Sequence, residues 1–396
     1  MQQDFLLSGL QLMSSDSKIF LIAGEASGDL LGARLMSSLK KQSGNINFSG
    51  VGGQNMKAEG LISIFPMEDL SVMGIAEVLP KLSLLLARIS ETVEKILADQ
   101  PDVVVSIDAP DFCFRVAKKL KKRGYKGKIV HYVAPSVWAW RPGRAKKVAG
   151  FLDHLLCLLP FEPPYFEEHG LPATYIGHSV VESNIIKASS QNFRSLYDVP
   201  DDKRIILVLP GSRQGELARH LDLFLQTAET LSVMHPNLVF VMPTLSHLKQ
   251  QIETAAAKRA VSVIVTDNEM AKYNAFAAAD FALAASGTVA LELAYANVPS
   301  IICYKVNWIT GVIANMLVKT DYVSLPNIIL GEEVMPELLQ KNATIENLVN
   351  MSDCFLTNET FLKAQQQKFD LMRAKIQSAG KTPSEKAADV ILELIK

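Results

Sequence analysis

Short apolar runs alternate along the chain with longer segments whose apolar residues recur at helical spacing. This alternation is typical of parallel sheets, because each strand needs a helical crossover before the next strand can pair with it. The pattern therefore predicts an α/β fold. The predicted strands cover 19–23, 103–107, 128–133, 154–159 and 174–176 in the first half, and 205–209, 238–242, 261–265, 281–284 and 300–304 in the second half.

Two of the predicted strands break into a glycine-bearing turn, as the first strand of a doubly wound sheet does. They are KIFLIAGEASGDLLG at 18–32 and RIILVLPGSRQGE at 204–216. Ligands of such sheets bind beyond the carboxyl ends of the strands, where loop amides and helix N-termini attract anionic groups. We therefore expect two Rossmann-like, doubly wound domains that face a cleft.

The polar segment 183–203 separates the two predicted sheets, and we expect it to be the linker. The N-terminal domain then covers 1–182, and the C-terminal domain covers 204–356. The remaining segment, 357–396, has the pattern of amphipathic helices without a further strand. Whether these helices return to the N-terminal domain stays open.

The composition indicates a soluble globular chain, since 48% of its 396 residues are hydrophobic and 20% are charged. The four cysteines are far apart and form no C-x-x-C motif, which argues against a zinc site and a disulfide framework and favours a reducing compartment. No basic region precedes the first apolar residues, so the start does not have the pattern of a secretory signal. The apolar stretch 276–304 is interrupted by charged residues, which indicates a buried unit and not a membrane span.

The formal net charge of −1 hides a basic segment at 115–147, which contains twelve Lys or Arg residues and no Asp or Glu. Such a segment is either a solvated helix face or a surface for an anionic membrane or a phosphorylated substrate. Nucleic acid is disfavoured as a partner, because the aromatic residues in this segment follow no RNA-binding pattern and the whole chain is almost neutral.

A candidate phosphate site follows a predicted strand of the second half. Ser286, Gly287 and Thr288 stand where a helix should begin, and Glu292 lies one helical turn after Thr288. Amides at a helix start can hold a pyrophosphate, and a carboxylate one turn later can accept hydrogen bonds from both ribose hydroxyls. The alternative is an ordinary helix cap. Arg213, at the end of the other glycine turn, adds a permanent positive charge suited to a diphosphate.

In the first half, GEASGD at 24–29 lacks the G-x-G-x-x-G pattern, and no Walker lysine follows it, so neither a dinucleotide nor a P-loop nucleotide is indicated. The chain also contains no H-E-x-x-H and no G-x-S-x-G motif. Asp108 ends the apolar strand of PDVVVSID, and a carboxylate at the carboxyl end of a central strand can serve as a general base. The alternative is an Asp that caps a helix or braces a loop.

Nine motifs occur in a fixed order and cover most of 18–330, namely GEASGD, VMGIAEVL, IDAPDF, HYVAPSVWAWRPGR, PFE, IGH, LPGSR, ASGTVALE and VKTDYVSLPN. In these motifs and their order, the chain resembles bacterial lipid-A-disaccharide synthases. The resemblance implies an inverting, metal-independent glycosyltransferase of the two-Rossmann-domain type, GT-B, without a cofactor. It further implies that UDP-2,3-diacylglucosamine and 2,3-diacylglucosamine 1-phosphate react to the β-1,6-linked lipid A disaccharide 1-phosphate and UDP. The residues before 18 and the tail after about 332 depart from the family pattern.

The resemblance also implies roles for the candidate residues. Asp108 would be the base that takes a proton from the 6-hydroxyl of the acceptor. Arg213 and the amides of Ser286, Gly287 and Thr288 would stabilise the departing UDP, and Glu292 would hold its ribose. No D-x-D motif lies near these residues, so Arg213 and the helix dipole would take the place of a metal.

Two further residues match the family's site motifs, although the resemblance fixes no role for them. They are Glu25, grouped with the catalytic Asp108, and Asn327, grouped with the UDP-sugar site. The same resemblance places the enzyme in the cytoplasm, attached peripherally to the inner membrane, and leaves a homodimer open.

An apolar stripe runs along the predicted helix at 75–96. Such a stripe is usually part of a core, but resemblance to a peripheral membrane enzyme favours an element that is partly exposed to acyl chains or to the membrane. Arg141 and Arg144 of the basic segment are assigned to the same acceptor or membrane surface. The apolar candidates are Val78, Leu79, Leu82, Leu85 and Leu86.

Two other classes of protein remain as alternatives. A nucleotide-sugar 2-epimerase of the same fold would share the phosphate-binding half, but it has no use for an apolar stripe beside a basic segment. A lipid carrier or scaffold without catalysis would use the stripe and the basic segment, but it would not depend on Asp108 or Arg213. Release of UDP with and without a lipid acceptor separates these classes.

Overall fold

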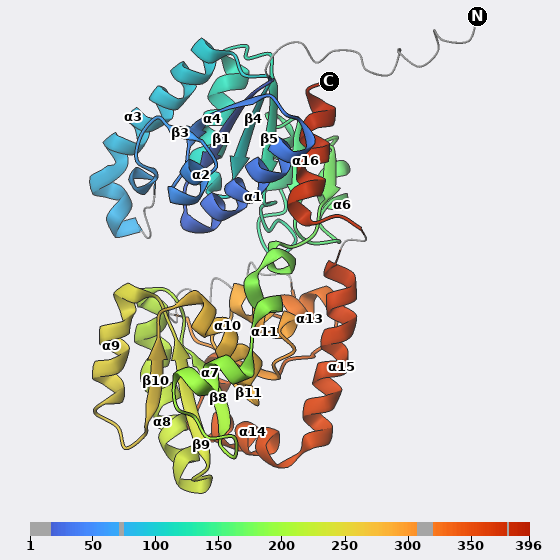
Figure 1. The fold of residues 1–396 in the computed structure, drawn as a ribbon. Coiled ribbons are helices and arrows are strands. Elements are labelled where there is room, and N and C mark those ends of the chain that lie inside the picture. Colours follow the sequence, from blue (N-terminus) through green and yellow to red (C-terminus); the bar gives the residue numbers. More distant parts are fainter. Residues whose placement is uncertain (1–16, 71–74, 307–319, 378–379) are drawn as a thin grey trace, which may run out of the picture. The chain divides into compact units, whose positions relative to one another are not determined.

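The computed structural model of the chain divides by its contacts into two compact units (Figure 1). Unit 1 consists of the described residues up to Val137, Arg141–Ser179 and the described residues after 377, and unit 2 consists of Trp138–Trp140 and Val180–Gln377. The structure describes 17–70, 75–306, 320–377 and 380–396, and for the helical residues 75–81 it describes the backbone alone.

Unit 1 contains a parallel sheet with the strand order β3-β2-β1-β4-β5-β6-β7. β1 and β4 lie at its centre and are buried on both faces, which explains their almost continuous apolar sequences. The pattern of the sequence missed β2 and β3 and found the other strands of unit 1. The strands are β1 (Ser17–Ala23), β2 (Ile46–Val51), β3 (Ile62–Ser63), β4 (Val103–Ile107), β5 (Lys128–Tyr132), β6 (His154–Cys157) and β7 (Ala173–Tyr175).

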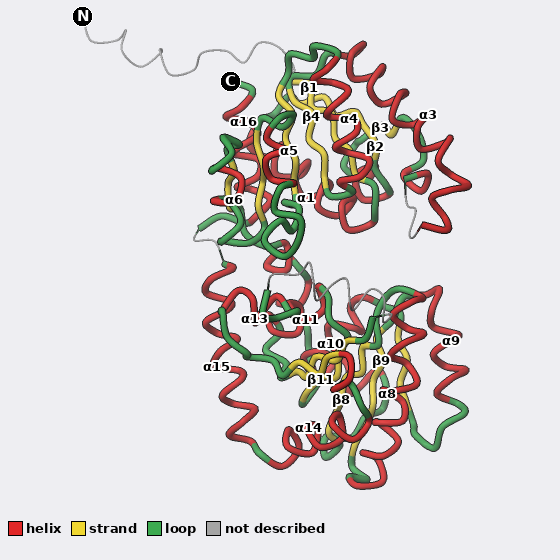
Figure 2. The backbone as a smooth tube through the Cα atoms, turned by 180° about the vertical axis from the view of Figure 1, so that it is seen from behind, coloured by secondary structure: helices red, strands yellow, loops and turns green. Residues whose placement is uncertain are grey.

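The helices of unit 1 cover both faces of this sheet (Figures 1 and 2). α1 packs against α2 and α16, and α3 packs against α4. The strand order reverses at β1, so right-handed crossovers place these two groups on opposite faces. The helices are α1 (Ala26–Gln42), α2 (Gln54–Ala58), η1 (Met67–Asp69), α3 (Ile75–Asp99), α4 (Pro110–Lys122), α5 (Arg144–Ala149), α6 (Pro164–Glu167) and α16 (Pro383–Leu394).

Unit 2 repeats the plan with a parallel sheet in the order β10-β9-β8-β11-β12-β13. The sequence pattern found every strand of this sheet except β13, an edge strand with three residues. Together, the two doubly wound sheets confirm the predicted α/β class, and the cleft between domains stays a prediction. The strands are β8 (Arg204–Leu209), β9 (Leu238–Pro243), β10 (Val263–Thr266), β11 (Phe281–Ala284), β12 (Ser300–Tyr304) and β13 (Glu337–Leu339).

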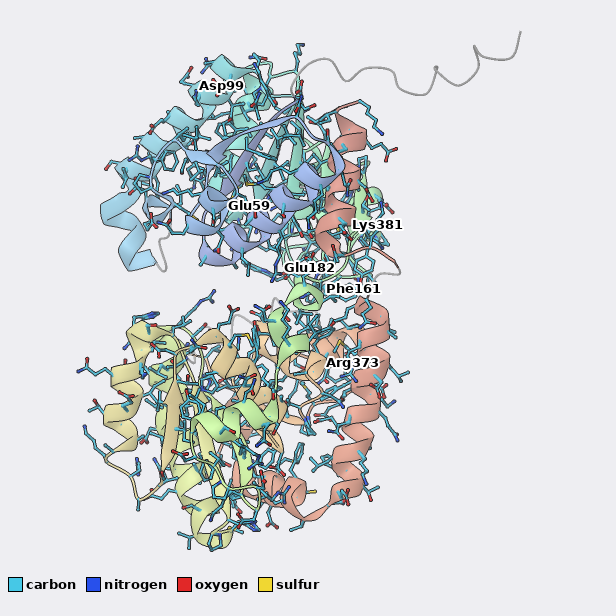
Figure 3. All side chains as sticks on the ribbon, viewed as in Figure 1. Glu59, Asp99, Phe161, Glu182, Arg373 and Lys381 are labelled. Carbon is cyan, nitrogen blue, oxygen red and sulfur yellow. The ribbon has the colours of Figure 1, made fainter. Side chains whose placement is uncertain are left out.

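Helices flank both faces of this second sheet as well. α8 packs against α9 and α14, and α11 packs against α13 and α15. Arg373 of α15, labelled in Figure 3, donates hydrogen bonds to the carbonyl oxygens of Ala294 and Tyr295, where α11 ends. The helices are η2 (Ser179–Glu182), η3 (Asn184–Lys187), α7 (Ser190–Leu196), α8 (Gln214–Met234), α9 (Ser246–Ala256), α10 (Glu269–Ala278), α11 (Thr288–Tyr295), α13 (Leu325–Leu330), η4 (Gln340–Asn342), α14 (Ile345–Thr357) and α15 (Glu359–Ile376).

Two segments differ from the expected domain limits. Residues 183–203, expected to be a linker, include η3 and α7, and α7 packs against α10 within unit 2. Of the two helices expected after 357, α15 belongs to unit 2, whereas α16 lies on α1 of unit 1, where Ser38 Oγ and Ser384 Oγ are 3.1 Å apart. None of the described helices combines the length and the apolar character that crossing a membrane requires.

Candidate functional site

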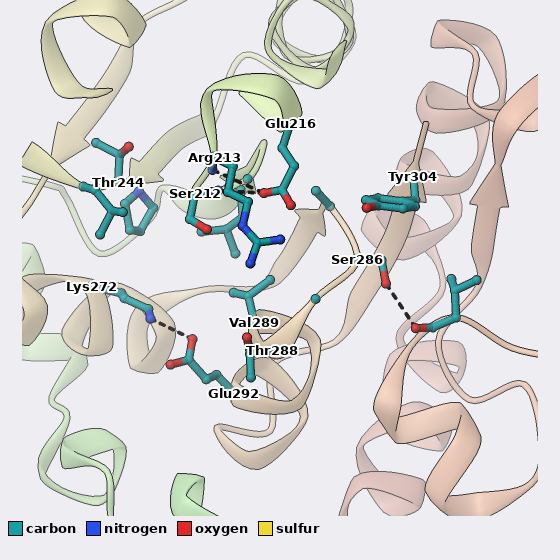
Figure 4. Close-up of a pocket in the computed structure, with 17 residues that line it drawn as sticks. Ser212, Arg213, Glu216, Thr244, Lys272, Ser286, Thr288, Val289, Glu292 and Tyr304 are labelled. Carbon is teal, nitrogen blue, oxygen red and sulfur yellow. Dashed lines mark hydrogen bonds and ion pairs between the residues drawn. The ribbon is translucent and has the colours of Figure 1, made fainter. Parts of the chain in front are cut away.

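A pocket of about 590 Å³ lies in unit 2, beyond the carboxyl ends of β8, β9, β11 and β12 (Figure 4). This is the edge at which doubly wound sheets bind ligands. The pocket brings together Arg213, Ser286, Gly287, Thr288 and Glu292, which the sequence analysis selected from segments far apart in the chain. The remaining lining residues are Leu209, Gly211, Ser212, Glu216, Pro243, Thr244, Leu245, Lys272, Ala285, Val289, Tyr304 and Val323.

The turn between β8 and α8 forms one wall of the pocket. Gly211 has a φ of +120°, and a Cβ atom there would lie 2.5 Å from Cβ of Glu216, so the turn needs glycine. The carboxylate of Glu216 accepts hydrogen bonds from the backbone N–H groups of Ser212 and Arg213, at 3.1 and 3.3 Å. The Glu216 carboxylate therefore already accepts the hydrogen bonds of these two backbone N–H groups.

The guanidinium of Arg213 remains available for a ligand. Its side chain is exposed and makes no hydrogen bond or ion pair with another described residue. Figure 4 shows it extending from the start of α8 toward Val289, near the start of α11. Arginine keeps its positive charge at any working pH and presents several donors in one plane, so this position suits an anionic ligand with several oxygen atoms.

The start of α11 forms the second wall. Gly287 is the N-cap residue, and it has no side chain with which to cap the helix. The first N–H groups of a helix have no partner within it and carry partial positive charge, so an uncapped start attracts an anion. Ser286 Oγ instead donates a hydrogen bond to the carbonyl oxygen of Val323, at 3.2 Å.

Glu292 lies one turn further along α11 and is held by a cation. Lys272 of α10 approaches it with 2.7 Å between Nζ and Oε2, and both side chains are mostly buried. Sequence reasoning missed Lys272, because α10 carries no motif and only the fold brings it beside α11. The second carboxylate oxygen of Glu292 makes no hydrogen bond with another described residue, so it can accept one from a ligand.

His220 of α8 contacts the chain where β12 ends, beside the pocket. It is buried on α8, its Nε2 accepts a hydrogen bond from Lys305 N–H at 2.9 Å, and its ring stacks on the pocket residue Tyr304. Since Nε2 is an acceptor, Nδ1 carries the proton. The Nδ1–H group donates a hydrogen bond to the Glu216 carbonyl oxygen at 2.8 Å. Burial lowers the pKa of His220, helped by the charge of Arg219, so this ring is neutral.

Asn327, which the sequence analysis grouped with the UDP-sugar site, is buried on α13 and is not among the pocket-lining residues. Its Oδ1 accepts hydrogen bonds from the backbone N–H groups of Val334 and Met335, and its Nδ2 donates to Met335 O and to Glu337. An Asn side chain offers two donors and two acceptor sites, so the amide of Asn327 is fully used within the protein.

In unit 1, Glu25 and Asp108 follow neighbouring strands. Ala23 of β1 pairs with Ile107 of β4, so both carboxylate residues leave the sheet at the same edge. Gly24 allows the turns after the two strands to approach closely, because a Cβ atom at this position would lie 2.8 Å from Cβ of Ala109. Glu25 is the N-cap residue of α1, half-buried, and its carboxylate has no hydrogen-bond partner among the described residues.

Asp108 lies in a strained turn. Its φ is +51° and that of Ala109 is +43°, which is unusual for residues with a Cβ atom. Its N–H donates to the carbonyl oxygen of Tyr132 at 2.9 Å, which fixes the turn to β5. Strain of this kind is often found at functional sites, where the surrounding structure maintains it.

Three buried residues, Ser106, His131 and Cys113, lie near this turn. Ser106 Oγ is 2.8 Å from Nδ1 of His131, and burial lowers the pKa of His131 to about 3. Burial also raises the pKa of the Cys113 thiol, and the negative charge of Asp108 raises it further. These groups therefore stay uncharged.

The apolar stripe on α3 divides into an exposed part and a core part. Leu82 and Leu86 are 41% and 45% exposed, and Leu85 is partly buried against the core. The next members of the stripe are fully buried, namely Ile89, Val93 and Ile96. The side chains of Val78 and Leu79, which the sequence analysis includes, lie outside the described residues.

Several side chains of the basic segment have partners within the protein. Arg123 of unit 1 forms an ion pair with Glu94 of α3 at 2.6 Å, and Lys121 pairs with Asp153 at 2.8 Å. Arg144 lies over the ring of Phe114, with 5.2 Å between Cζ and the ring centroid, whereas Arg141 is exposed. Within the described ranges, no group of three His, Cys, Asp or Glu side chains could hold a metal ion.

Comparison with known proteins gives matches over almost the whole chain. The family model of lipid-A-disaccharide synthetase matches residues 19–391. The lipid-A-disaccharide synthase of Rhodospirillum centenum is 46% identical over 381 residues, which cover 95% of this chain and 94% of the relative. The lipid-A-disaccharide synthase of Gluconobacter oxydans is 41% identical over 377 residues, with 95% of this chain and 90% of the relative covered.

Solved structures show the same architecture at low sequence identity. The UDP-GlcNAc 2-epimerase of Neisseria meningitidis, solved with UDP-GlcNAc bound, superposes with a TM-score of 0.63 and 11% identity over 95% of this chain and 98% of the other. MurG of Acinetobacter baumannii superposes with a TM-score of 0.57 and 13% identity over 95% and 99%. At such identities the similarity concerns the fold alone.

Proposed function

The chain belongs to the lipid-A-disaccharide synthetase family, as its motifs indicated, and from this premise we propose how its residues perform the reaction. It is a glycosyltransferase of lipid A biosynthesis with a GT-B-like fold. The substrates that this activity implies are UDP-2,3-diacylglucosamine as the donor and 2,3-diacylglucosamine 1-phosphate as the acceptor. The products are the β-1,6-linked disaccharide 1-phosphate and UDP.

The pocket of unit 2 is the proposed donor site. A single observation carries this assignment: the Arg213 guanidinium, which has no partner among the described residues, the start of α11 and the carboxylate of Glu292 all line one cavity. The diphosphate binds the amides of α11 and Arg213, and the ribose hydroxyls donate to Glu292. Both contacts to the diphosphate stabilise the negative charge that develops on UDP as it leaves.

Asp108 of unit 1 is the proposed base. Its carboxylate takes the proton of the acceptor 6-hydroxyl, and the oxygen attacks the anomeric carbon of the donor. The bond between that carbon and the diphosphate breaks on the opposite face, so the anomeric configuration inverts. UDP leaves with the bonding electron pair, and the proton remains on Asp108. Glu25, beside Asp108 at the edge of the sheet, is the second carboxylate assigned to this site.

The lipid substrates call for a surface that meets the membrane. We assign this role to Leu82 and Leu86 of α3, which are exposed although they are apolar, together with exposed basic residues such as Arg141. A partly exposed apolar stripe inserts at the lipid interface, and basic side chains near it attract anionic headgroups. The proposed location is therefore the cytoplasmic face of the inner membrane. The homodimer stays a prediction.

The decisive experiment combines the purified protein with both lipid substrates and measures the disaccharide 1-phosphate and UDP by mass spectrometry. We expect both products in equal amounts only when the acceptor is present, and an unchanged rate in the presence of EDTA. An epimerase would instead change the donor sugar at C2 without any acceptor. Activity that EDTA abolishes and magnesium restores would overturn the metal-independent mechanism.

A further inference from the structure

We propose that Glu337 is a positioning residue of the donor site, which holds the wall formed by Val323 and Ser286 in place for the UDP diphosphate. Glu337 itself does not line the pocket. The proposal rests on the proposed function, because it assigns the pocket of unit 2 to UDP.

The carboxylate of Glu337 gathers four donors from one short segment. Glu337 begins the edge strand β13, where it pairs with Ile302 of β12. Its Oε1 accepts hydrogen bonds from Ser324 N–H at 2.9 Å, from Ser324 Oγ at 2.7 Å and from Asn327 Nδ2 at 2.8 Å. Its Oε2 accepts one from Val323 N–H at 2.9 Å. Hydrogen bonds to an ionised carboxylate are stronger than those between neutral groups.

The donors around Glu337 are uncharged. Among the described residues, no Lys, Arg or His forms an ion pair with this carboxylate. Its charge is therefore balanced by the N–H and O–H groups of the segment from Val323 to Asn327, and that segment is fixed to β13. Four donors, two of them backbone N–H groups, hold this carboxylate in one orientation.

Asn327 makes the arrangement rigid from the other side. Three of its four hydrogen bonds go to the backbone of Val334 and Met335, at 2.8 Å each, and the fourth goes to Glu337. Asn327 thus joins the start of α13 to the chain that leads into β13. This accounts for a polar residue that is completely buried, without assigning it a contact with substrate.

The last link reaches the pocket. Val323 lines it, and the carbonyl oxygen of Val323 accepts the hydrogen bond from Ser286 Oγ, drawn as a dashed line in Figure 4. Ser286 directly precedes Gly287, the N-cap residue of α11. A continuous series of hydrogen bonds therefore runs from Asn327 through Glu337 and Val323 to the turn whose amides would bind the diphosphate.

The test measures UDP binding by titration calorimetry on the folded, full-length protein, since this readout does not need the lipid substrates. Glu337→Ala removes all four hydrogen bonds, and we expect the Kd for UDP to rise about tenfold or more. Glu337→Gln keeps the shape of the side chain but places its NH₂ group against one of the N–H donors. We expect a smaller rise of the Kd for UDP, about threefold. Glu332→Ala, an exposed acid of the same segment that pairs with Lys368, is the control and should bind UDP as the wild type does.

The outcomes separate positioning from general stability. Loss of folded protein alone would lower the binding stoichiometry and leave the Kd unchanged, so an unchanged Kd in folded Glu337→Ala overturns the proposal. If that variant does not fold, Glu337→Gln decides, and wild-type affinity in it overturns the proposal equally. A wild-type protein that does not bind UDP would instead overturn the donor site itself, on which this proposal depends.

Discussion

Lys272 of α10 and Glu292 of α11 form an ion pair, with 2.7 Å between Nζ and Oε2, inside the proposed donor pocket. The ammonium group of Lys272 also lies 5.1 Å from the ring centroid of Tyr273 and 5.5 Å from that of Phe276. The rings and the carboxylate together restrict Lys272, and Lys272 in turn restricts Glu292. The carboxylate is thus oriented before any ribose arrives, which lowers the entropy lost on binding.

Replacing Lys272 by Met should therefore weaken donor binding. The variant keeps most of the apolar volume but leaves Glu292 without its cation, and we expect the KM for the UDP-sugar to rise about tenfold with little change in kcat. Steady-state kinetics at saturating acceptor measures both constants. Lys368→Met, which breaks the surface pair with Glu332, is the control. Equal effects of the two variants would show that the pocket pair has no special role.

Replacing Asp108 by Ala should lower kcat by about two to four orders of magnitude, the usual contribution of a general base, and leave UDP binding unchanged. Circular dichroism and the melting temperature check that the variant folds. Asp102→Ala is the control, because Asp102 stands at the opposite end of β4, where it accepts a hydrogen bond from Lys18 N–H. Near-normal turnover in Asp108→Ala, together with loss of turnover in Asp111→Ala, would transfer the role of base to that exposed neighbour at the start of α4.

The stripe on α3 allows a matched test of membrane binding. Leu82→Ser combined with Leu86→Ser changes two exposed side chains, so we expect the protein to shift from anionic vesicles to solution without loss of its cooperative melt. Ile89→Ser combined with Val93→Ser changes two buried side chains of the same helix and should destabilise unit 1 by several kcal/mol. Vesicle sedimentation and thermal melts measure these effects. Unchanged sedimentation of the first variant would remove α3 from the membrane surface.

His131 should make the protein sensitive to acid. Its pKa in the folded state is about 3, below the ordinary value of 6.5, so the unfolded chain binds more protons between these values. The stabilisation is complete above pH 6.5, and the free energy of unfolding should fall by about 1.4 kcal/mol per pH unit as the pH decreases below it. His131→Asn should reduce this slope between pH 6.5 and 5 in urea titrations. His247→Gln, at an exposed position of α9, is the control, and an identical slope in all three proteins would contradict the assignment.

The sequence predicted every strand of the two sheets except β2, β3 and β13, and it predicted the pocket residues that follow β8 and β11, because both depend on local pattern. β8 and β11 are apolar runs, and each is followed by a turn that contains a glycine. The edge strands β3 and β13 were missed, since two or three residues are too few to show a period. Their place in the sheet comes from pairing with a neighbour.

Residues whose roles depend on tertiary contacts could not be predicted for a similar reason. Lys272 and Glu337 carry no motif, and each depends on a partner that the fold brings to it. The division of α3 also depends on tertiary structure, because Leu86 and Ile89 are equally apolar and only the packing of α3 on unit 1 distinguishes them.

The position of α16 on α1 affects the order in which the protein can fold during synthesis. All of Val180–Gln377, the bulk of unit 2, is translated between the two parts of unit 1. Until α16 leaves the ribosome, the α1 surface that packs against Ala387, Ala388 and Ile391 of α16 is exposed to water. Unit 2 can thus complete its core first, and the nascent unit 1 presents an apolar surface to chaperones for the whole time that unit 2 is being made.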